Sequence, residues 1–222
     1  MAFVVRVWDL PTRCFHWTLV LCVTGLLISG SLGGAAMEWH FRFGYGVATL
    51  LLFRTLWGFV GGYWSRFSSF FYAPKQVLRY LQGSFSSEKH TGHNPLGALS
   101  VYAMLFFLMF QVASGLMSDD EIVAAGPLVR HVAGSWVSYA TFYHKQIGKI
   151  VLLGLISLHL GAIAFHFFAR HDNLVQPMLT GDKLLLNETA ASVDSAKQRW
   201  LAIFVFLICS AGVASLIYWL EK

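Results

Sequence analysis

Four histidines lie in or beside long apolar stretches of this 222-residue chain: His16, His40, His144 and His159. An imidazole in the hydrocarbon region of a membrane is costly without a partner, so these residues are candidates for function. His144 and His159 are 15 residues apart, which is roughly 22 Å along a helix with a net rotation of about 60°. One helix is therefore expected to offer a ligand to each of two cofactors at different depths in a bilayer.

Sorted by expected depth, the four histidines form two pairs, each from two different helices. His16 pairs with His159 near the inner side of the membrane, and His40 pairs with His144 near the outer side. Paired histidines on facing helices are the axial ligands of b-type haems, and they leave no open position on the iron. The pattern predicts two haem b groups and electron transfer. The alternative is four separate interfacial or water-lined histidines, which does not explain the matched depths.

Three further residues are candidates for the same sites. His166 is an alternative to His159 as the inner ligand, because it lies seven residues further along the same face of one helix. Arg54 is expected near the middle of an apolar span, where an unpaired arginine costs about 2.5–3.5 kcal/mol. A haem propionate is its candidate partner, and snorkelling to the inner surface is the alternative. Arg13, near His16, is also a candidate propionate partner, although membrane topology alone explains its position.

The composition predicts that these residues belong to an all-α integral membrane protein. The chain is 56% hydrophobic and 12% charged, about half the charged fraction of a soluble domain. Five stretches reach the length of about 20 residues that a membrane-spanning helix needs: 14–32, 43–63, 96–117, 147–168 and 200–220. We expect a four-helix haem-binding bundle over residues 1–185, followed by a polar linker and a fifth transmembrane helix over residues 186–222.

The distribution of basic residues predicts the orientation in the membrane. With the N-terminus inside, ten of the 16 lysines and arginines fall on the inner side and five on the outer side, with Arg54 inside a span. This bias favours a cytoplasmic N-terminus and a periplasmic C-terminus in a bacterial inner membrane. The formal charge of +5 therefore reflects topology, and no nucleic-acid partner is expected. The three cysteines form no Cys-x-x-Cys pair, so neither a covalently attached haem nor a zinc site is supported.

Local signals place several boundaries along the chain. Asp9 and Pro11 are expected to cap and open the first helix, and Asn94 with Pro95 to do the same for the third span. Residues 74–81 predict a short helix on the membrane surface, ended by Gly83. Residues 118–143 are expected to form an outer loop that ends in aromatic side chains, and residues 172–197 an inner polar segment. His90 and His93 are expected at the inner surface, and no internal repeat is evident.

Several motifs resemble the bacterial cytochrome b561 and nickel–iron hydrogenase b-type cytochrome family. They occur in the family's order over residues 4 to 185: Val7-Trp8-Asp9 with Arg13 and His16-Trp17, the run 53–61, the run 92–97, Leu158-His159 with His166, and the run 172–175 with Thr180-Gly181. The resemblance implies a bundle that holds two haems, with His16, His40, His144 and His159 at the positions of the haem ligands. The spacing from His144 to His159 is one residue longer than in many members, which indicates either a bulge or a His144 that precedes the regular helix.

The sequence therefore predicts a dihaem membrane cytochrome b. It would pass electrons between quinone and a redox protein, such as a c-type cytochrome or a hydrogenase-like subunit, as part of a respiratory oxidoreductase. A first alternative is a self-sufficient quinone-linked enzyme that acts on a small substrate such as superoxide, although the acidic run 119–121 disfavours anion steering. A second alternative is a membrane anchor or transporter without a cofactor, which leaves the paired histidines unexplained.

Overall fold

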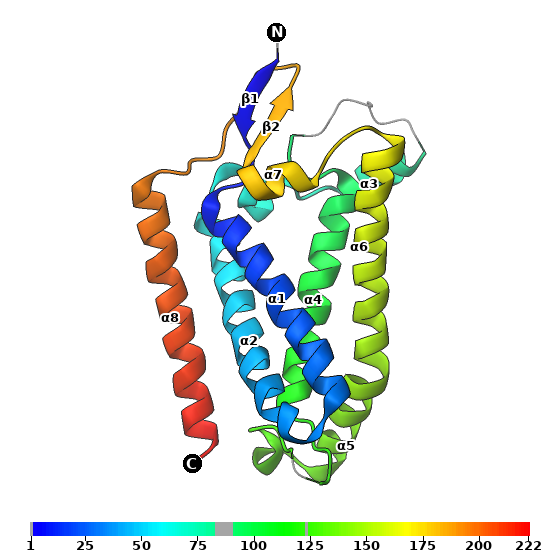
Figure 1. Ribbon diagram of the computed structural model, residues 1–222, viewed down its shortest axis with the longest axis vertical. Helices are drawn as coiled ribbons and strands as arrows, with labels where there is room; N and C mark the ends of the chain where they lie inside the picture. The colour runs from blue at the N-terminus through cyan, green and yellow to red at the C-terminus, as the bar shows by residue number, and fades with distance from the viewer. Residues whose placement is uncertain (1, 83–90, 123) are drawn as a thin grey trace. The chain divides into compact units, whose positions relative to one another are not determined.

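The computed structural model describes residues 2–82, 91–122 and 124–222 (Figure 1). Within this part the elements follow in the order β1 (Phe3–Arg6), α1 (Leu10–Leu32), α2 (Met37–Val60), α3 (Pro74–Leu81), α4 (Pro95–Leu116), α5 (Gly134–Phe142), α6 (Lys149–Ala169), α7 (Val175–Thr180), β2 (Asp182–Leu185) and α8 (Ala196–Leu220). A π-helical turn, Tyr143–Gly148, joins α5 to α6. The expected helical class is confirmed, with one small antiparallel ribbon added to it.

Five helical segments of the described chain are long and apolar enough to cross a membrane: Leu10–Leu32, Gly34–Val60, Pro95–Leu116, Gly134–Ala169 and Ala196–Leu220. They confirm the five predicted spans and make the chain a multi-pass membrane protein. A helix suits this role because it satisfies its backbone hydrogen bonds internally, which lipid cannot do. Large apolar side chains such as Leu21 and Phe168 remain more than two-thirds exposed, as expected for surfaces that contact acyl chains.

The fourth span begins earlier than the sequence predicted. Its helix starts at Gly134, not near residue 147, so the expected outer loop is shorter and its aromatic end is helical. Trp136 and Tyr139 lie exposed on α5, a position that suits a membrane interface. Hydroxyl side chains lower the hydropathy of α5, which is why the sequence placed this segment in a loop. The Ser138 Oγ donates back to the Gly134 carbonyl (3.1 Å), so this side chain is compatible with a helix.

The predicted helix starts are confirmed. The Thr12 N–H donates to Asp9 Oδ1 (2.8 Å) at the start of α1, and the Gly97 N–H donates to Asn94 Oδ1 (2.7 Å) at the start of α4. Each carboxylate or amide oxygen satisfies a backbone donor that the first helical turn leaves unpaired. The predicted short helix is also present, as α3. Gly83 and His90 lie outside the described residues, and the placement of α3 on the membrane surface stays a prediction.

The chain forms two compact units, each assembled from three stretches. The first comprises Met1–Cys14, Arg54–Ala103 and Ser157–Phe204, and the second comprises Phe15–Phe53, Met104–Ile156 and Val205–Lys222. In the second unit, Val47, Leu51 and Leu108 form a buried core against which side chains of α1, α4 and α6 pack. The predicted boundary at residue 185, between the haem-binding bundle and the C-terminal linker and helix, is not tested by this division and stays a prediction.

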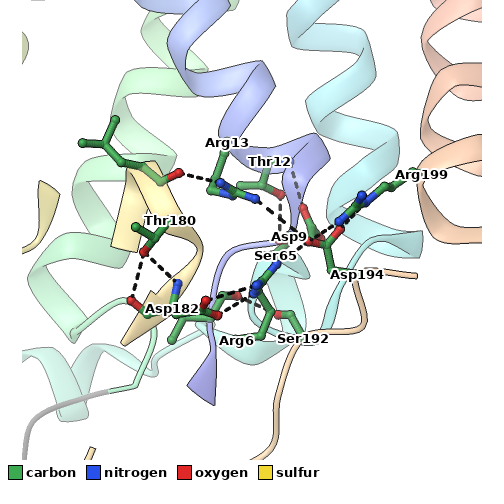
Figure 2. A network of polar contacts seen from close by, with 12 residues as sticks. Arg6, Asp9, Thr12, Arg13, Ser65, Thr180, Asp182, Ser192, Asp194 and Arg199 are labelled. Atoms are coloured by element: carbon green, nitrogen blue, oxygen red, sulfur yellow. Dashed lines mark hydrogen bonds and ion pairs between the residues drawn. The ribbon is translucent and has the colours of Figure 1, made fainter. Parts of the chain in front are cut away.

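In the first unit, a two-stranded ribbon joins segments from the two ends of the chain. Strands β1 and β2 pair antiparallel, from Phe3 opposite Leu185 to Arg6 opposite Asp182. Figure 2 shows how Arg6 continues this pairing through its side chain: Nε donates to Asp182 (2.6 Å) and Nη1 to Asp194 (2.6 Å). The ribbon was not predicted, because each strand has four residues and its partner is remote in the sequence.

Asp9 is the centre of a second polar cluster in the same unit. Its side chain is fully buried and accepts hydrogen bonds from the Gly62 N–H (2.8 Å), the Ser65 hydroxyl (3.0 Å) and the Trp57 indole N–H (3.2 Å), besides that of Thr12. A buried carboxylate is tolerated when donors surround it in this way. The residue that caps α1 therefore also holds the end of α2.

Candidate functional site

His40 and His144, in the second unit, face each other as the sequence predicted. Their ring centroids are 6.1 Å apart and their planes are nearly perpendicular, at 86°. An imidazole nitrogen binds a first-row metal at about 2.0 Å, so two axial imidazoles on one ion have centroids about 6.2 Å apart. The separation of the two rings therefore matches that of two imidazoles on one metal ion.

The other nitrogen of each ring points at a main-chain carbonyl. His40 Nδ1 lies 3.1 Å from the Leu26 oxygen on α1, and His144 Nδ1 lies 2.9 Å from the Gln111 oxygen on α4. A carbonyl oxygen only accepts hydrogen bonds, so both Nδ1 atoms carry the proton. The lone pair of each ring is then on Nε2, the state in which a histidine binds a metal.

Two glycines allow the imidazole rings to come this close to α1 and α4. A Cβ at Gly30 would lie 3.0 Å from His40 Cε1, and a Cβ at Gly115 would lie 2.7 Å from His144 Cε1. Any side chain at these positions would push the imidazoles away from the carbonyls.

The extra residue between His144 and His159 is accommodated by the π-helical turn, which confirms the bulge. An α-helix would direct the N–H of Gly148 to the His144 carbonyl. In the π-helical turn the backbone donor lies one residue further on, and the Gln111 side-chain Nε2 donates to the same oxygen at 2.9 Å. Gly148 leaves room for it, since a Cβ there would lie 1.9 Å from Gln111 Oε1. Gln111 thus contacts His144 twice, through its carbonyl and through its side chain, and the sequence did not single it out.

The predicted inner ligands lie on α1 and α6, in different units. His16 is partly buried and its ring makes an edge contact with Trp17, with centroids 5.1 Å apart. His159 is partly buried in the middle of α6. The alternative ligand His166 has its Nε2 3.5 Å from the Asn94 amide nitrogen. The pairing of His16 with His159, or with His166, stays a prediction.

Arg54 is buried in the first unit and does not snorkel. Only 4% of its surface is exposed, and its guanidinium carbon lies 4.8 Å from the centre of the Phe67 ring. Its Nη1 has no hydrogen-bond partner among the described residues, and none of their ion pairs involves this arginine. A buried guanidinium left with donor capacity fits the acidic group of a bound cofactor.

His93, predicted at the inner surface, is partly exposed, and its ring packs against two aromatic side chains. Its ring centroid is 4.8 Å from that of Trp8 and 4.7 Å from that of Phe70. Its Nδ1 is buried without a partner among the described residues. Burial, the positive charge of Arg54 and the nearby His159 lower the His93 pKa to about 3, so this ring is neutral at physiological pH. In the sequence, the position of His93 was indicated by its place directly before Asn94, the cap of α4.

Arg13 is largely engaged within the first unit. Its Nη1 donates to the Leu179 carbonyl (2.6 Å), and its Nη2 lies 4.0 Å from Asp194 (Figure 2). These contacts agree with the alternative that membrane topology and local packing explain the position of Arg13. Its predicted contact with a propionate stays a prediction.

A protein-only metal centre is absent from the described part of the chain, where no three histidine, cysteine or carboxylate side chains come together around one point. Two facing imidazoles supply too few ligands for a bare ion but suit a metal that brings an equatorial ring of its own. The His40–His144 pair therefore fits haem, and the absence of Cys-x-x-Cys fits a haem held without covalent attachment.

Comparison with known proteins identifies the family of this chain. The family described as prokaryotic cytochrome b561 matches residues 7–181. Among curated proteins, the chain is 26% identical to a probable Ni/Fe-hydrogenase B-type cytochrome subunit of Azotobacter chroococcum mcd 1, covering 83% of this chain and 90% of that protein. It is 24% identical to the protein of the same name from Rhizobium leguminosarum bv. viciae, covering 81% and 89%. No solved structure gives a significant match. The chain belongs to the prokaryotic cytochrome b561 family, and is a multi-pass membrane b-type cytochrome that uses haem b to transfer electrons.

Proposed function

We propose that this chain is a dihaem cytochrome b that passes electrons between the quinone pool and a redox protein partner. The observation that carries the proposal is the His40–His144 pair, with ring centroids 6.1 Å apart and both Nδ1 atoms hydrogen-bonded to carbonyls. This separation matches that of two imidazoles that bind one metal ion from opposite sides, and both rings have their outer nitrogen occupied by a carbonyl.

In this proposal the chain's residues bind and orient two haem groups and exclude other ligands from them. His40 and His144 hold the outer haem, and His16 and His159 hold the inner one, with His166 as the alternative to His159. Haem iron supplies reversible one-electron oxidation and reduction. Two imidazoles on each iron leave no position for oxygen, and the surrounding apolar helices keep water away. Arg54 and His93, with unpaired buried nitrogens, are proposed to hold the acidic edge of the inner haem.

The proposed partners follow from the membrane setting and from the relatives. A carrier that exchanges electrons with buried haems from within the bilayer must be lipid-soluble, as quinone is. The relatives' names include a hydrogenase, so a hydrogenase-like subunit is the first candidate for the protein partner, and a c-type cytochrome is the second. The inner membrane, with the N-terminus cytoplasmic, is the proposed location.

The first experiment counts haem. Purified protein is expected to carry two b haems per chain by pyridine haemochrome assay, and one haem would contradict the dihaem proposal. His40→Ala and His144→Ala should each lose one haem, the same one in both variants, as judged by the remaining spectrum and potential. Loss of both haems in a variant that still folds would show that the two histidines do not serve a separate site.

A second experiment decides the inner ligand. If His159 is the ligand, His159→Ala loses the inner haem and His166→Ala keeps both. The reverse result would assign His166. Circular dichroism of each variant serves as the control for folding, since loss of helix would make the haem count uninformative.

A third experiment addresses quinone and the protein partner separately. A short-chain quinol analogue should reduce the haems of the purified protein in a stopped-flow measurement, and no reduction would contradict the quinone site. Affinity purification from mild detergent should bring down a redox subunit, identified by mass spectrometry and by its ability to exchange electrons with the purified cytochrome.

A further inference from the structure

We infer that two matching cradles position the outer histidines and tune the haem they bind. Each cradle comprises a main-chain carbonyl, a serine three residues later and a glycine directly after it: Leu26, Ser29 and Gly30 on α1, and Gln111, Ser114 and Gly115 on α4. The inference rests on the proposed function, because it assumes that His40 and His144 hold haem.

The two cradles agree in their contacts. Both serine Oγ atoms lie 3.4 Å from the Nδ1 of the histidine that they face. Both serines are buried inside apolar helices, at 4% and 3% exposure. Both glycines leave space that a Cβ would take from the imidazole. The two cradles thus share a main-chain carbonyl acceptor, a serine hydroxyl and a glycine at the same spacing. Helix packing alone requires only small residues and does not explain the shared contacts with the imidazoles.

The hydroxyl groups act as acceptors toward the imidazoles. The Ser29 Oγ donates its proton to the Gly25 carbonyl (2.6 Å), and the Ser114 Oγ donates to the Gln111 carbonyl (3.0 Å). A hydroxyl has one proton and two lone pairs, so what each serine turns toward Nδ1–H is a lone pair. Each imidazole N–H therefore meets a carbonyl and, more weakly, a hydroxyl oxygen.

This arrangement has two consequences for a bound metal. It holds the proton on Nδ1, which leaves the lone pair on Nε2 free to bind a metal. It also makes each imidazole a stronger electron donor, because hydrogen bonding of the outer N–H raises the basicity of a ligating histidine. Stronger donation favours the ferric state, so the cradles lower the reduction potential of the outer haem.

The arrangement is also a structural repeat within the second unit. Helix α1 serves His40 of α2 in the way that α4 serves His144, which lies in the π-helical turn before α6. The sequence alone showed no internal repeat, because the two five-residue segments share only Ser-Gly. They read Leu-Leu-Ile-Ser-Gly at 26–30 and Gln-Val-Ala-Ser-Gly at 111–115.

The serines are tested by the potential of the outer haem. We expect Ser29→Ala and Ser114→Ala to keep both haems but to shift the outer haem to a higher potential in spectroelectrochemical titration, with the largest shift in the double variant. Ser29→Thr and Ser114→Thr, which keep the hydroxyl, should restore the wild-type value, and the inner haem should not change. An unchanged outer potential in the double alanine variant would overturn the inference, since a purely structural serine affects stability without moving one potential.

The glycines are tested by haem retention. Gly30→Ala and Gly115→Ala should lose the outer haem selectively, because the added methyl group displaces the ligand ring. Gly212→Ala is the matched control, since a Cβ there meets nothing within 4 Å, and it should keep both haems. An outer haem of wild-type content and potential in Gly115→Ala would overturn the cradle geometry.

These outcomes are separable from failure of the proposed function. If His40→Ala or His144→Ala keeps both haems, the outer site itself is wrong. If those variants lose the outer haem while the serine and glycine variants behave as wild type, the site stands and the cradles alone are refuted.

Discussion

Buried polar residues of this protein fall into two groups that differ in how their hydrogen-bonding capacity is used. Asp9 is fully buried and its carboxylate accepts from four groups of the chain. Arg54 is buried and His93 partly buried in the same unit, and each retains a buried nitrogen without a partner among the described residues. Since burial of an unpaired polar group is costly, the first arrangement indicates a structural role and the second indicates a site for a ligand.

Replacement of Arg54 should therefore affect the inner haem only. Arg54→Met removes a charged donor, and hydrogen bonds to charged groups contribute about 1.5–3 kcal/mol, so retention of the inner haem should fall by roughly 10- to 100-fold. The measurement is haem content after dilution in the presence of apomyoglobin as an acceptor.

Arg42→Met is the matched control for this change. Arg42 is exposed, pairs with Glu38 four residues earlier and lies over the Trp39 ring, so its replacement should leave the inner haem in place. A gain in haem retention in Arg54→Met would show that the buried charge does not contact the cofactor.

Among the secondary-structure elements, the π-helical turn has the most direct effect on the site. It changes the direction in which His144 leaves the helix relative to α6, and Gln111 donates a side-chain hydrogen bond to the His144 carbonyl within it. The turn persists because a glycine stands where the glutamine side chain enters. This agrees with the common occurrence of π-turns at functional sites.

Gly148→Ala should disturb this element. Its Cβ would overlap Gln111 Oε1, so the glutamine must withdraw and give up its hydrogen bond to the His144 carbonyl, at a cost of about 0.5–1.5 kcal/mol. We expect a lower melting temperature and weaker binding of the outer haem, with the inner haem retained. Gly161→Ala is the control on the same helix, because its Cβ meets no neighbour within 4 Å. Equal behaviour of the two variants would mean that Gln111 is not a support for His144.

For the whole molecule, one carboxylate joins segments from both ends of the chain. Asp194 accepts from Arg6 (2.6 Å) and Arg199 (3.0 Å) and lies 4.0 Å from Arg13 (Figure 2). Burial raises the pKa of Asp194, but hydrogen bonds from Arg199, the Leu10 N–H and Arg6, with the charge of Arg199, outweigh it, so the pKa is lower than usual. A depressed carboxyl pKa stabilises the folded state above the ordinary pKa of about 3.9, and this stabilisation is lost as pH falls through the folded value.

Asp194→Asn should therefore destabilise the protein in a pH-dependent way. At pH 7 we expect a loss of about 1.5–3 kcal/mol, the range for hydrogen bonds to charged groups, seen as a lower melting temperature in detergent. The difference from wild type should shrink as pH falls below about 4. Glu188→Gln is the control, since Glu188 is exposed and in none of the ion pairs of the described residues. A difference that is constant with pH would contradict the electrostatic role.

The orientation of the whole chain is also testable. Five spans and the two-to-one excess of basic residues on one side predict a periplasmic C-terminus. Alkaline phosphatase fused after Lys222 should be active, whereas a fusion within the loop between α2 and α4 should not. The reverse pattern of activities would invert the topology and exchange the inner and outer haem positions.

The sequence by itself determined the features that depend on local composition. Apolar length predicted the five spans, and the types and spacing of Asp9 and Asn94 predicted two helix starts. The depth of His40 and His144 predicted that they meet. These features are predictable because hydropathy and capping involve residues close together in the chain.

Only the tertiary structure decided what surrounds those residues. The pairing of β1 with β2, the packing of the His93 ring against Trp8 and Phe70, and the contacts of His40 and His144 with carbonyls of other helices all join remote segments. A main-chain carbonyl has no side-chain signature, since every residue carries one. Which carbonyl meets which imidazole therefore depends on how the helices pack, and that packing determines how the histidines are protonated and aimed.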